Sequence, residues 1–231
     1  MTAGAVAERV ASLRARIAAA ALRAGRAPSD VLLIAVSKTQ PPAAIAEAIA
    51  AGIQAIGENR VQEAAPKIEA LRVSHPGVRW HLVGHLQRNK AAAAVQLFDM
   101  LHGVDSEPLA RAMSARATRT VPILLEVNVA GEATKFGVRP QDAARLAERI
   151  GALPHLELQG LMTVAPQVDH PEEVRPVFRA LRELRDAIGL RELSMGMTED
   201  FEIAIDEGAT MVRIGRATFG PRHAHAPRET A

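Results

Sequence analysis

The first candidate for chemistry is a lysine at the end of a long apolar segment. Lys38 follows VLLIAVS (31–37), a run of aliphatic and β-branched residues that is typical of a strand buried on both faces. A lysine that leaves such a strand either extends into water or stays in a partly dry site, where its amine is nucleophilic toward carbonyl compounds. The position therefore predicts either a Schiff-base lysine or an ordinary solvated one.

Two turns rich in small residues come near the end of the chain, SMGMTED (194–200) and RIGRATFG (213–220). Each follows a short apolar run and leads into a helical segment, so backbone N–H groups and the positive end of a helix dipole are expected there. Such places bind phosphate, and glycine lets the backbone approach the anion. One such turn is commonplace. Both together with Lys38 fit a ligand with an aldehyde at one end and a phosphate at the other.

Histidines and an asparagine follow other apolar runs. His81 and His85 have the spacing of two helical zinc ligands, but His81 falls in a predicted strand, so we expect no metal site. We expect His81, His85 and His102 to fill the mouth of the fold as hydrogen-bonded polar groups. Asn59 follows the second predicted strand, and its amide is expected to reach the ligand or the lysine.

The charged residues of two further segments can be explained without a role in catalysis. In GENRVQEAAPK (57–67), Arg60, Glu63 and Lys67 are spaced as a solvated helix face with pairs three and four residues apart. Arg88 and Lys90 form a basic rim that suits either a phosphate or a protein partner.

Eight short apolar runs alternate with amphipathic stretches, which is the pattern of βα units that build a parallel sheet. Strands are expected at 31–37, 53–57, 79–84, 100–104, 121–129, 156–163, 192–196 and 211–215, and helices at 41–51, 60–74, 86–95, 106–118, 140–151, 171–188 and 199–208. This predicts the α/β class and a single closed (β/α)8 TIM barrel; an open doubly wound sheet is the alternative. In a barrel, the strand-end residues above gather at the functional face.

No Ser/Gly/Pro-rich linker interrupts the series, so we expect one domain over 1–231. The apolar residues of 1–27 recur at helical spacing and predict an extra N-terminal helix that packs on the barrel. Residues 221–231 lack periodicity and are expected to form a frayed tail.

Composition limits the class of protein. The chain has no cysteine, a formal charge of +2 and an aromatic fraction of 3% with no tyrosine. These values exclude disulfides and thiolate chemistry and do not favour a nucleic-acid surface. No apolar run approaches the roughly 20 residues of a membrane span, and no secretory signal is apparent, so we expect a cytoplasmic protein without membrane contact.

Eight blocks of the sequence, in order, are similar to one known family. The chain resembles the pyridoxal phosphate homeostasis proteins (the YggS/PROSC family), which share their barrel with the N-terminal domain of alanine racemase. The blocks are AVSKT (35–39), IGENRVQEA (56–64), WHLVGHLQRNK (80–90), HGVDS (102–106), VNVAGEATKFGV (127–138), GLMTVAP (160–166), LSMGMTEDFEIAI (193–205) and GATMVRIGRATFG (208–220).

The resemblance implies a barrel that binds pyridoxal 5′-phosphate (PLP), with Lys38 as the Schiff-base lysine. It also implies that Arg213 faces the pyridine nitrogen, whose protonation the positive charge would oppose. The other implied contacts are the hydroxyl of Thr198 and the amides of Gly215 and Arg216 at the phosphate, with Ser194 and Met197 lining that end. The family usually has serine in place of Thr198, and serine or threonine in place of Arg216, which leaves the role of the Arg216 side chain open.

The resembling racemases also use a tyrosine from an additional domain as a second base, and neither is expected here. We therefore expect a PLP carrier that buffers the cofactor, hands it to apo PLP-dependent enzymes and does not turn over a substrate. A racemase-like enzyme with another base, and a barrel that binds some other phosphorylated metabolite, are the alternatives. The resemblance suggests a monomer or weak dimer.

Overall fold

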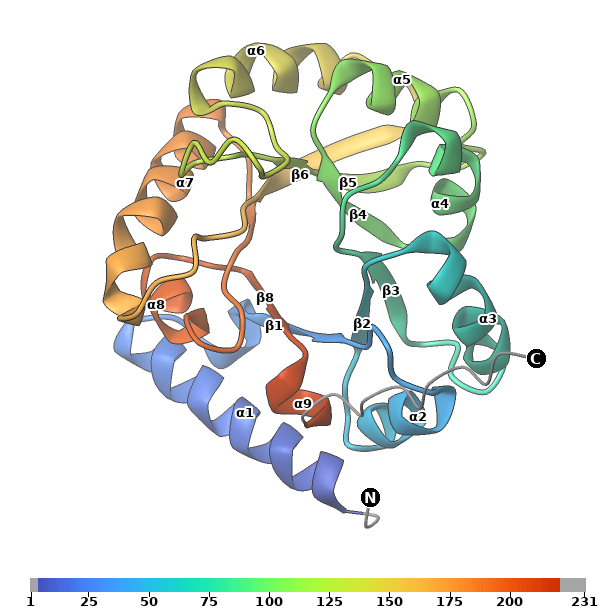
Figure 1. The fold of residues 1–231 in the computed structure, drawn as a ribbon, viewed down its shortest axis with the longest axis vertical. Helices are drawn as coiled ribbons and strands as arrows, with labels where there is room; N and C mark the ends of the chain where they lie inside the picture. Colours follow the sequence, from blue (N-terminus) through green and yellow to red (C-terminus); the bar gives the residue numbers. More distant parts are fainter. Residues whose placement is uncertain (1–3, 221–231) are drawn as a thin grey trace, which may run out of the picture.

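The computed structural model describes residues 4–220 and contains a closed barrel of eight parallel strands in sequence order (Figure 1). Because β1 pairs with β8 as well as with β2, the sheet has no edge, so the TIM-barrel prediction is confirmed and the open sheet is wrong. The strands are β1 (Leu32–Val36), β2 (Ala55–Glu58), β3 (Arg79–Leu82), β4 (Met100–Val104), β5 (Val121–Glu126), β6 (Leu156–Met162), β7 (Glu192–Ser194) and β8 (Met211–Ile214).

Helices surround the barrel, as Figure 1 shows in the view along its axis. They are α1 (Ala5–Arg23), α2 (Pro42–Ala50), α3 (Val61–Arg72), α4 (Ala91–Leu97), α5 (Glu107–Ser114), α6 (Pro140–Gly151), α7 (Arg175–Ile188), α8 (Phe201–Asp206) and α9 (Arg216–Phe219), with 3-10 turns η1 (Pro28–Asp30), η2 (Arg88–Lys90) and η3 (Pro171–Val174). A helical segment was expected after the last turn, but the predicted helix ranges do not include α9, because a single turn is too short to show periodicity.

The extra N-terminal helix is present and packs on α2, α8 and α9. Its buried face consists of Val6, Val10, Leu13, Ile17, Ala20 and Ala21, which recur every three or four residues as an amphipathic helix requires. The predicted tail, 221–231, lies outside the described residues. Within residues 4–220, no helix combines the length and the apolar character needed to cross a bilayer.

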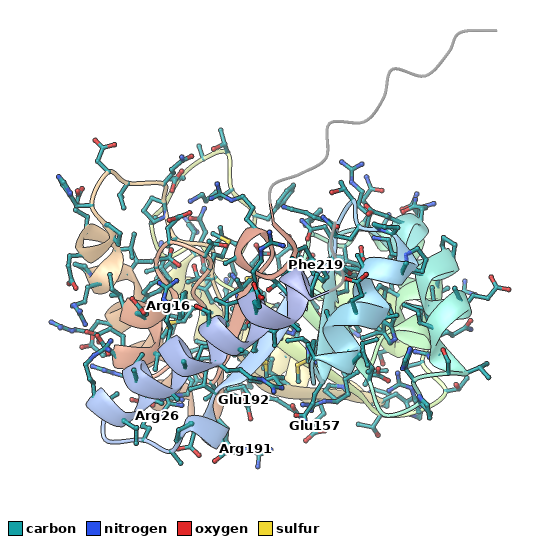
Figure 2. The ribbon with its side chains drawn as sticks, turned by 90° about the horizontal axis from the view of Figure 1, so that it is seen from below. Arg16, Arg26, Glu157, Arg191, Glu192 and Phe219 are labelled. Atoms are coloured by element: carbon teal, nitrogen blue, oxygen red, sulfur yellow. The ribbon has the colours of Figure 1, made fainter. Side chains whose placement is uncertain are left out.

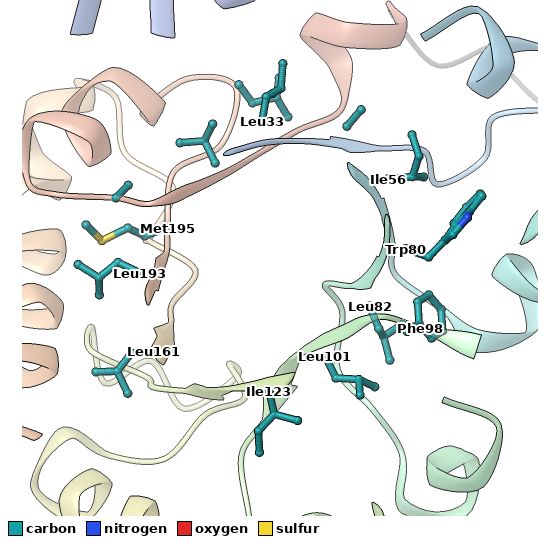
Figure 3. Packing of buried hydrophobic residues seen from close by; sticks show 14 of the residues in the cluster. Leu33, Ile56, Trp80, Leu82, Phe98, Leu101, Ile123, Leu161, Leu193 and Met195 are labelled. Carbon is teal, nitrogen blue, oxygen red and sulfur yellow. The ribbon is translucent and has the colours of Figure 1, made fainter. Parts of the chain in front are cut away.

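Apart from residues near the amino ends of β3 and β6, the strands are buried on both faces, because one face packs on helices and the other fills the barrel. Side chains of the outer layer, such as Leu33, Ile56 and Trp80, project from the strands toward the helices (Figure 3). Ile34 and Val36 alternate with the outer residues of β1 and belong to a separate inner cluster. This alternation decides which polar residues of the later strands face the barrel interior.

The two ends of the barrel differ in what they carry. Glu192 at the start of β7 lies at one end with Glu157 and Arg26 (Figure 2). The carboxyl ends of the strands lie at the opposite end and carry the loops that hold the strand-end residues predicted from the sequence.

Candidate functional site

A cavity of about 520 Å³ opens at the carboxyl ends of the strands. Its walls come from the segments that follow β1, β2, β6, β7 and β8, together with Val83 after β3. This volume is in the range of small-molecule and cofactor sites. Of the eight predicted cofactor contacts, the cavity brings together seven, namely Lys38, Asn59, Met197, Thr198, Arg213, Gly215 and Arg216.

A buried ion pair between Lys67 and Glu58 anchors the backbone next to Lys38. The Lys67 ammonium donates to the Ser37 carbonyl and to Glu58 Oε1, both at 2.8 Å. The Ser37 hydroxyl donates to the same Glu58 oxygen at 2.5 Å. Burial raises the pKa of Glu58, and the bonds from Lys67 and Ser37 oppose that rise. The strand end before Lys38 is therefore fixed by three polar groups that have little exposure to water.

The residue after Lys38 is also held. Thr39 has a φ of 66°, a left-handed conformation that is unfavourable for a β-branched residue. Its amide donates to Glu63 Oε1 at 2.5 Å, and Lys67 donates to the same oxygen at 2.8 Å. Burial raises the pKa of Glu63, but the bonds from Lys67 and Thr39 outweigh it and hold that pKa below its usual value. The expectation that Lys67 lies on a solvated face is wrong, because Lys67 is buried beneath the Lys38 turn.

The other predicted end of the ligand site consists of tight turns. Gly196 has a φ of 93°, and a Cβ there would lie 2.6 Å from the Ala204 methyl. A Cβ on Gly215 would lie 3.1 Å from the Val36 carbonyl oxygen, so the turn after β8 runs closely past the end of β1. These contacts explain why glycines occupy the two turns, and Gly215 brings backbone to the cavity wall.

The helix dipole expected at this end contributes little, because α9 spans four residues and α8 six. The Arg216 side chain is exposed and pairs with Glu199 at 3.0 Å. The cavity therefore presents a cation at its rim next to the turn amides, in addition to the Thr198 hydroxyl.

Arg213 is buried and reaches the cavity from the barrel interior. One guanidinium nitrogen donates to Ser194 Oγ at 2.7 Å and another to the Thr163 carbonyl at 2.8 Å. Burial lowers the pKa of Arg213 to about 10, and the carboxyl groups of Glu126 and Asp200 oppose that change. Arg213 thus stays positively charged at neutral pH.

Ser194 does not line the cavity, and its predicted place at the phosphate end is incorrect. The side chain is fully buried and lies between Arg213 and His102. The alternation of β7 turns Ser194 into the barrel, one layer below the mouth.

His81 and His102 are hydrogen-bonded as predicted, but they lie inside the barrel rather than at its mouth, and His85 Nδ1 makes no hydrogen bond within the described residues. Their rings join through His81 Nδ1 and His102 Nε2 at 2.9 Å. His85 lies 3.4 Å from Asp105 and stacks on Phe136. Within the described part of the chain, no three histidine, aspartate or glutamate side chains gather in a way that could hold a metal ion.

Glu126 is a buried carboxyl that sequence reasoning missed. Its Oε2 has no hydrogen-bond partner among the described residues, and a Cβ on Gly103 would lie 3.3 Å from it. Burial and then the charge of Asp105 raise the pKa of Glu126 to about 7, with Arg213 opposing.

Replacing Glu126 by glutamine is expected to stabilise the protein at pH 8 but not at pH 4.5. Between the ordinary value of 4.5 and the folded value of about 7, the folded state keeps a proton that the unfolded chain has lost. Stability therefore falls as pH rises through this window, by roughly 3 kcal/mol in full. Urea unfolding of both proteins at the two pH values measures the difference. An equal difference at both would show that Glu126 carries no such proton.

Little in the sequence indicated that two other segments line the cavity. The segment VAPQV (164–168) has no reactive group and stood out only as part of a resemblance block. Asp200 lines the cavity and accepts a bond from the Met197 amide at 2.5 Å. An acidic residue three positions after a turn residue and just before FEIAI matches the helix-start pattern and could have revealed this contact.

Comparison with known proteins places these features in context. Residues 9–223 match the family model described as "Alanine racemase, N-terminal domain". The pyridoxal phosphate homeostasis protein of Aquifex aeolicus is 44% identical over 224 residues, which cover 93% of this chain and 97% of that protein. The homologous protein of Pseudomonas aeruginosa, with the same name, is 44% identical over 227 residues, 96% of this chain and 98% of its own length.

A solved structure is similar over nearly the same span. The structure of PipY from Synechococcus elongatus, solved with PLP bound, has a TM-score of 0.81 and 38% identity, and covers 93% of this chain and all of that chain.

Proposed function

The chain belongs to the family of the pyridoxal phosphate homeostasis proteins, built on the alanine racemase N-terminal barrel, and we propose that it binds PLP as a Schiff base on Lys38 and carries it without substrate turnover. The single observation that carries the proposal is the cavity lined by Lys38 on one side and by the Thr198 and Gly215 turns on another. The PLP-bound relative supports the choice of ligand.

The residues present fit this cofactor. Lys38 is the one lysine of the described chain that lines the cavity, and the bonds of Ser37 and Thr39 hold its backbone in place. When bound, the cofactor supplies an electrophilic aldehyde, with which the Lys38 amine condenses with loss of water. Thr198 and the amides of Gly215 and Arg216 would hold the phosphate, and Asn59 and Met197 would contact the ligand from the wall.

The case for a carrier rather than a racemase rests on the missing second base, and Arg213 adds to it. Its guanidinium is held inside the barrel at the cavity, where a second positive charge on the cofactor ring would be repelled. An unprotonated ring is a weak electron sink, so it stabilises a carbanion poorly. The sequence also holds no tyrosine that could act as a second base of the racemase kind.

The same proposal includes the partners and the compartment. We propose that apo PLP-dependent enzymes in the cytoplasm receive the cofactor, and that the carrier acts as a monomer or weak dimer, which light scattering at several concentrations would distinguish. The cavity opens at the mouth, so an acceptor could draw the cofactor out without unfolding the barrel.

Titration of the purified protein with PLP tests the proposal. We expect a Schiff-base absorbance band that saturates near one equivalent, and phosphate esters without an aldehyde should bind more weakly. Solvent deuterium exchange at the α-carbon of added amino acids should not exceed the rate with free cofactor. Equal binding of the esters would favour a general phosphate-ester barrel, and faster exchange would favour the racemase-like enzyme.

A further inference from the structure

A line of four buried side chains runs from the cavity into the barrel. Arg213 of β8 bonds to Ser194 of β7 at 2.7 Å, and Ser194 bonds to His102 Nδ1 of β4 at 2.8 Å. His102 Nε2 then meets His81 Nδ1 of β3 at 2.9 Å. The exposed fractions are 5% for Arg213, 0% for Ser194 and His102, and 1% for His81. We call these four residues the interior relay.

The donors and acceptors of the interior relay can be ordered. Arg213 has only donors, so Ser194 Oγ accepts from it, and the single hydroxyl hydrogen is left for His102 Nδ1. In this arrangement His102 carries its proton on Nε2 and donates to His81 Nδ1, whereas the opposite tautomer would leave the Ser194 hydrogen without an acceptor among these contacts. Each step follows from the one before, so the orientation of the Ser194 hydroxyl depends on the neutral form of His102.

The charges around the interior relay maintain that form. Burial lowers the pKa of His102 well below its ordinary value, and His81 and Arg213 lower it further. Burial, with a contribution from Arg79, lowers the pKa of His81 to about 3. Both rings thus remain neutral at physiological pH. A proton on His102 Nδ1 would turn it into a second donor and place a cation across the hydroxyl from Arg213.

The Arg213 guanidinium is anchored by two acceptors within the barrel. The Ser194 hydroxyl and the Thr163 carbonyl accept from two different nitrogens of its guanidinium, which fixes both the position and the plane of the group. The remaining N–H groups are available to the cavity that Arg213 lines.

We propose that Ser194 and His102 are positioning residues, which hold the Arg213 guanidinium in the orientation that it presents to the ring of bound PLP. His81 acts only by accepting from His102 Nε2 and so holding the His102 tautomer, a role that an asparagine at position 102 does not need. This inference rests on the proposed function. It assigns to the barrel interior a role in setting the electronic state of the cofactor, in addition to filling the core.

Two substitutions of His102 separate positioning from packing. The side-chain oxygen of asparagine can replace the Nδ1 acceptor, so His102→Asn keeps the bond from Ser194. The amide of glutamine reaches the position of Nε2, so His102→Gln keeps the bond to His81 and loses the Ser194 side. Ser194→Ala removes the hydroxyl altogether with a minimal change in volume.

The readouts are PLP affinity, the pH at which the absorbance of the bound cofactor changes, and thermal unfolding. Loss of a hydrogen bond to a charged group should weaken binding about tenfold or more, and shift the absorbance transition by about one pH unit, in Ser194→Ala and His102→Gln. His102→Asn should resemble the wild type in both. If Ser194→Ala and His102→Gln lose stability but keep the wild-type affinity and transition, the side chains only fill the core. Should neither His102 variant fold, Ser194→Ala decides alone.

A second measurement needs no cofactor. Long-range ¹H–¹⁵N NMR spectra of the protein alone should show His102 neutral at pH 6 with its proton on Nε2. A proton on Nδ1, or on both nitrogens, would overturn the interior relay. This measurement is made without PLP, so it tests the interior relay independently of the proposed function. Failure of the proposed function would appear instead as a wild-type protein that gives no Schiff-base band with PLP.

Discussion

Replacing Lys38 by alanine is expected to abolish the Schiff-base absorbance of PLP and to weaken its binding on the order of 100-fold or more. The sequence contains four lysines, and within the described residues Lys38 alone lines the cavity. Lys67 is bonded to two glutamates, and Lys135 donates to Glu132 and to the Ala165 carbonyl. The reaction with the aldehyde should therefore depend on this one amine.

Lys90→Ala is the matched control for Lys38→Ala, since Lys90 lies in the turn η2 and does not line the cavity. It should titrate like the wild type, with the same band and the same stoichiometry. A Lys38→Ala protein that keeps the band would assign the Schiff base to another lysine and contradict the proposed role.

Replacing Lys67 by methionine is expected to lower the free energy of unfolding by about 3–5 kcal/mol. The substitution leaves the Glu58 carboxyl buried without its cation and removes the donor to the Ser37 carbonyl. The effect on the site should follow from the same contacts, because Ser37 and Thr39 flank Lys38. We expect weaker PLP binding even in the fraction of molecules that remains folded.

Urea unfolding, followed by PLP titration below the unfolding range, measures both effects. The double variant Glu58→Gln/Lys67→Met removes the unpaired charge and should recover part of the stability. Lys90→Met should change the free energy of unfolding by no more than roughly 0.5 kcal/mol. A Lys67→Met protein as stable as the Lys90→Met control would show that the buried pair does not hold the Lys38 turn.

The fold could be predicted because its signals are local. Each strand is a short apolar run, and each run is separated from the next by a helix of suitable length. The position of Lys38 followed for the same reason, since the last residue of an apolar run is visible in the sequence. Its place at the cavity then came from the rule that strand ends of a barrel lie at one face.

The support beneath the site could not be predicted, because it depends on contacts between elements. Lys67 lies on α3, and only the packing of that helix against β2 brings its ammonium to Ser37 and Glu58. On the helix alone, Glu63 and Lys67 are four residues apart and look like an exposed pair. The contribution of Lys67 to the free energy of unfolding depends on its burial, and that burial arises only in the assembled barrel.

The sequence also could not predict how deep inside the barrel each polar side chain lies. Ser194 and Thr198 belong to the same turn motif, but the first bonds to Arg213 within the interior and the second lines the cavity. His81, His102 and Glu126 were equally hard to place, because a polar residue in a short strand gives no sign of which layer it occupies. Sequence patterns identify the face of a strand but not the height at which its side chain meets its neighbours.

The most direct test is to reduce the PLP-loaded wild type with borohydride, digest it with trypsin and locate the modified lysine by mass spectrometry. A modified Lys38 resists cleavage, so we predict that the phosphopyridoxyl group appears on the peptide 27–60. Recovery of the label mainly on Lys67, Lys90 or Lys135, or on no peptide at all, would contradict a cofactor held by the amine of Lys38.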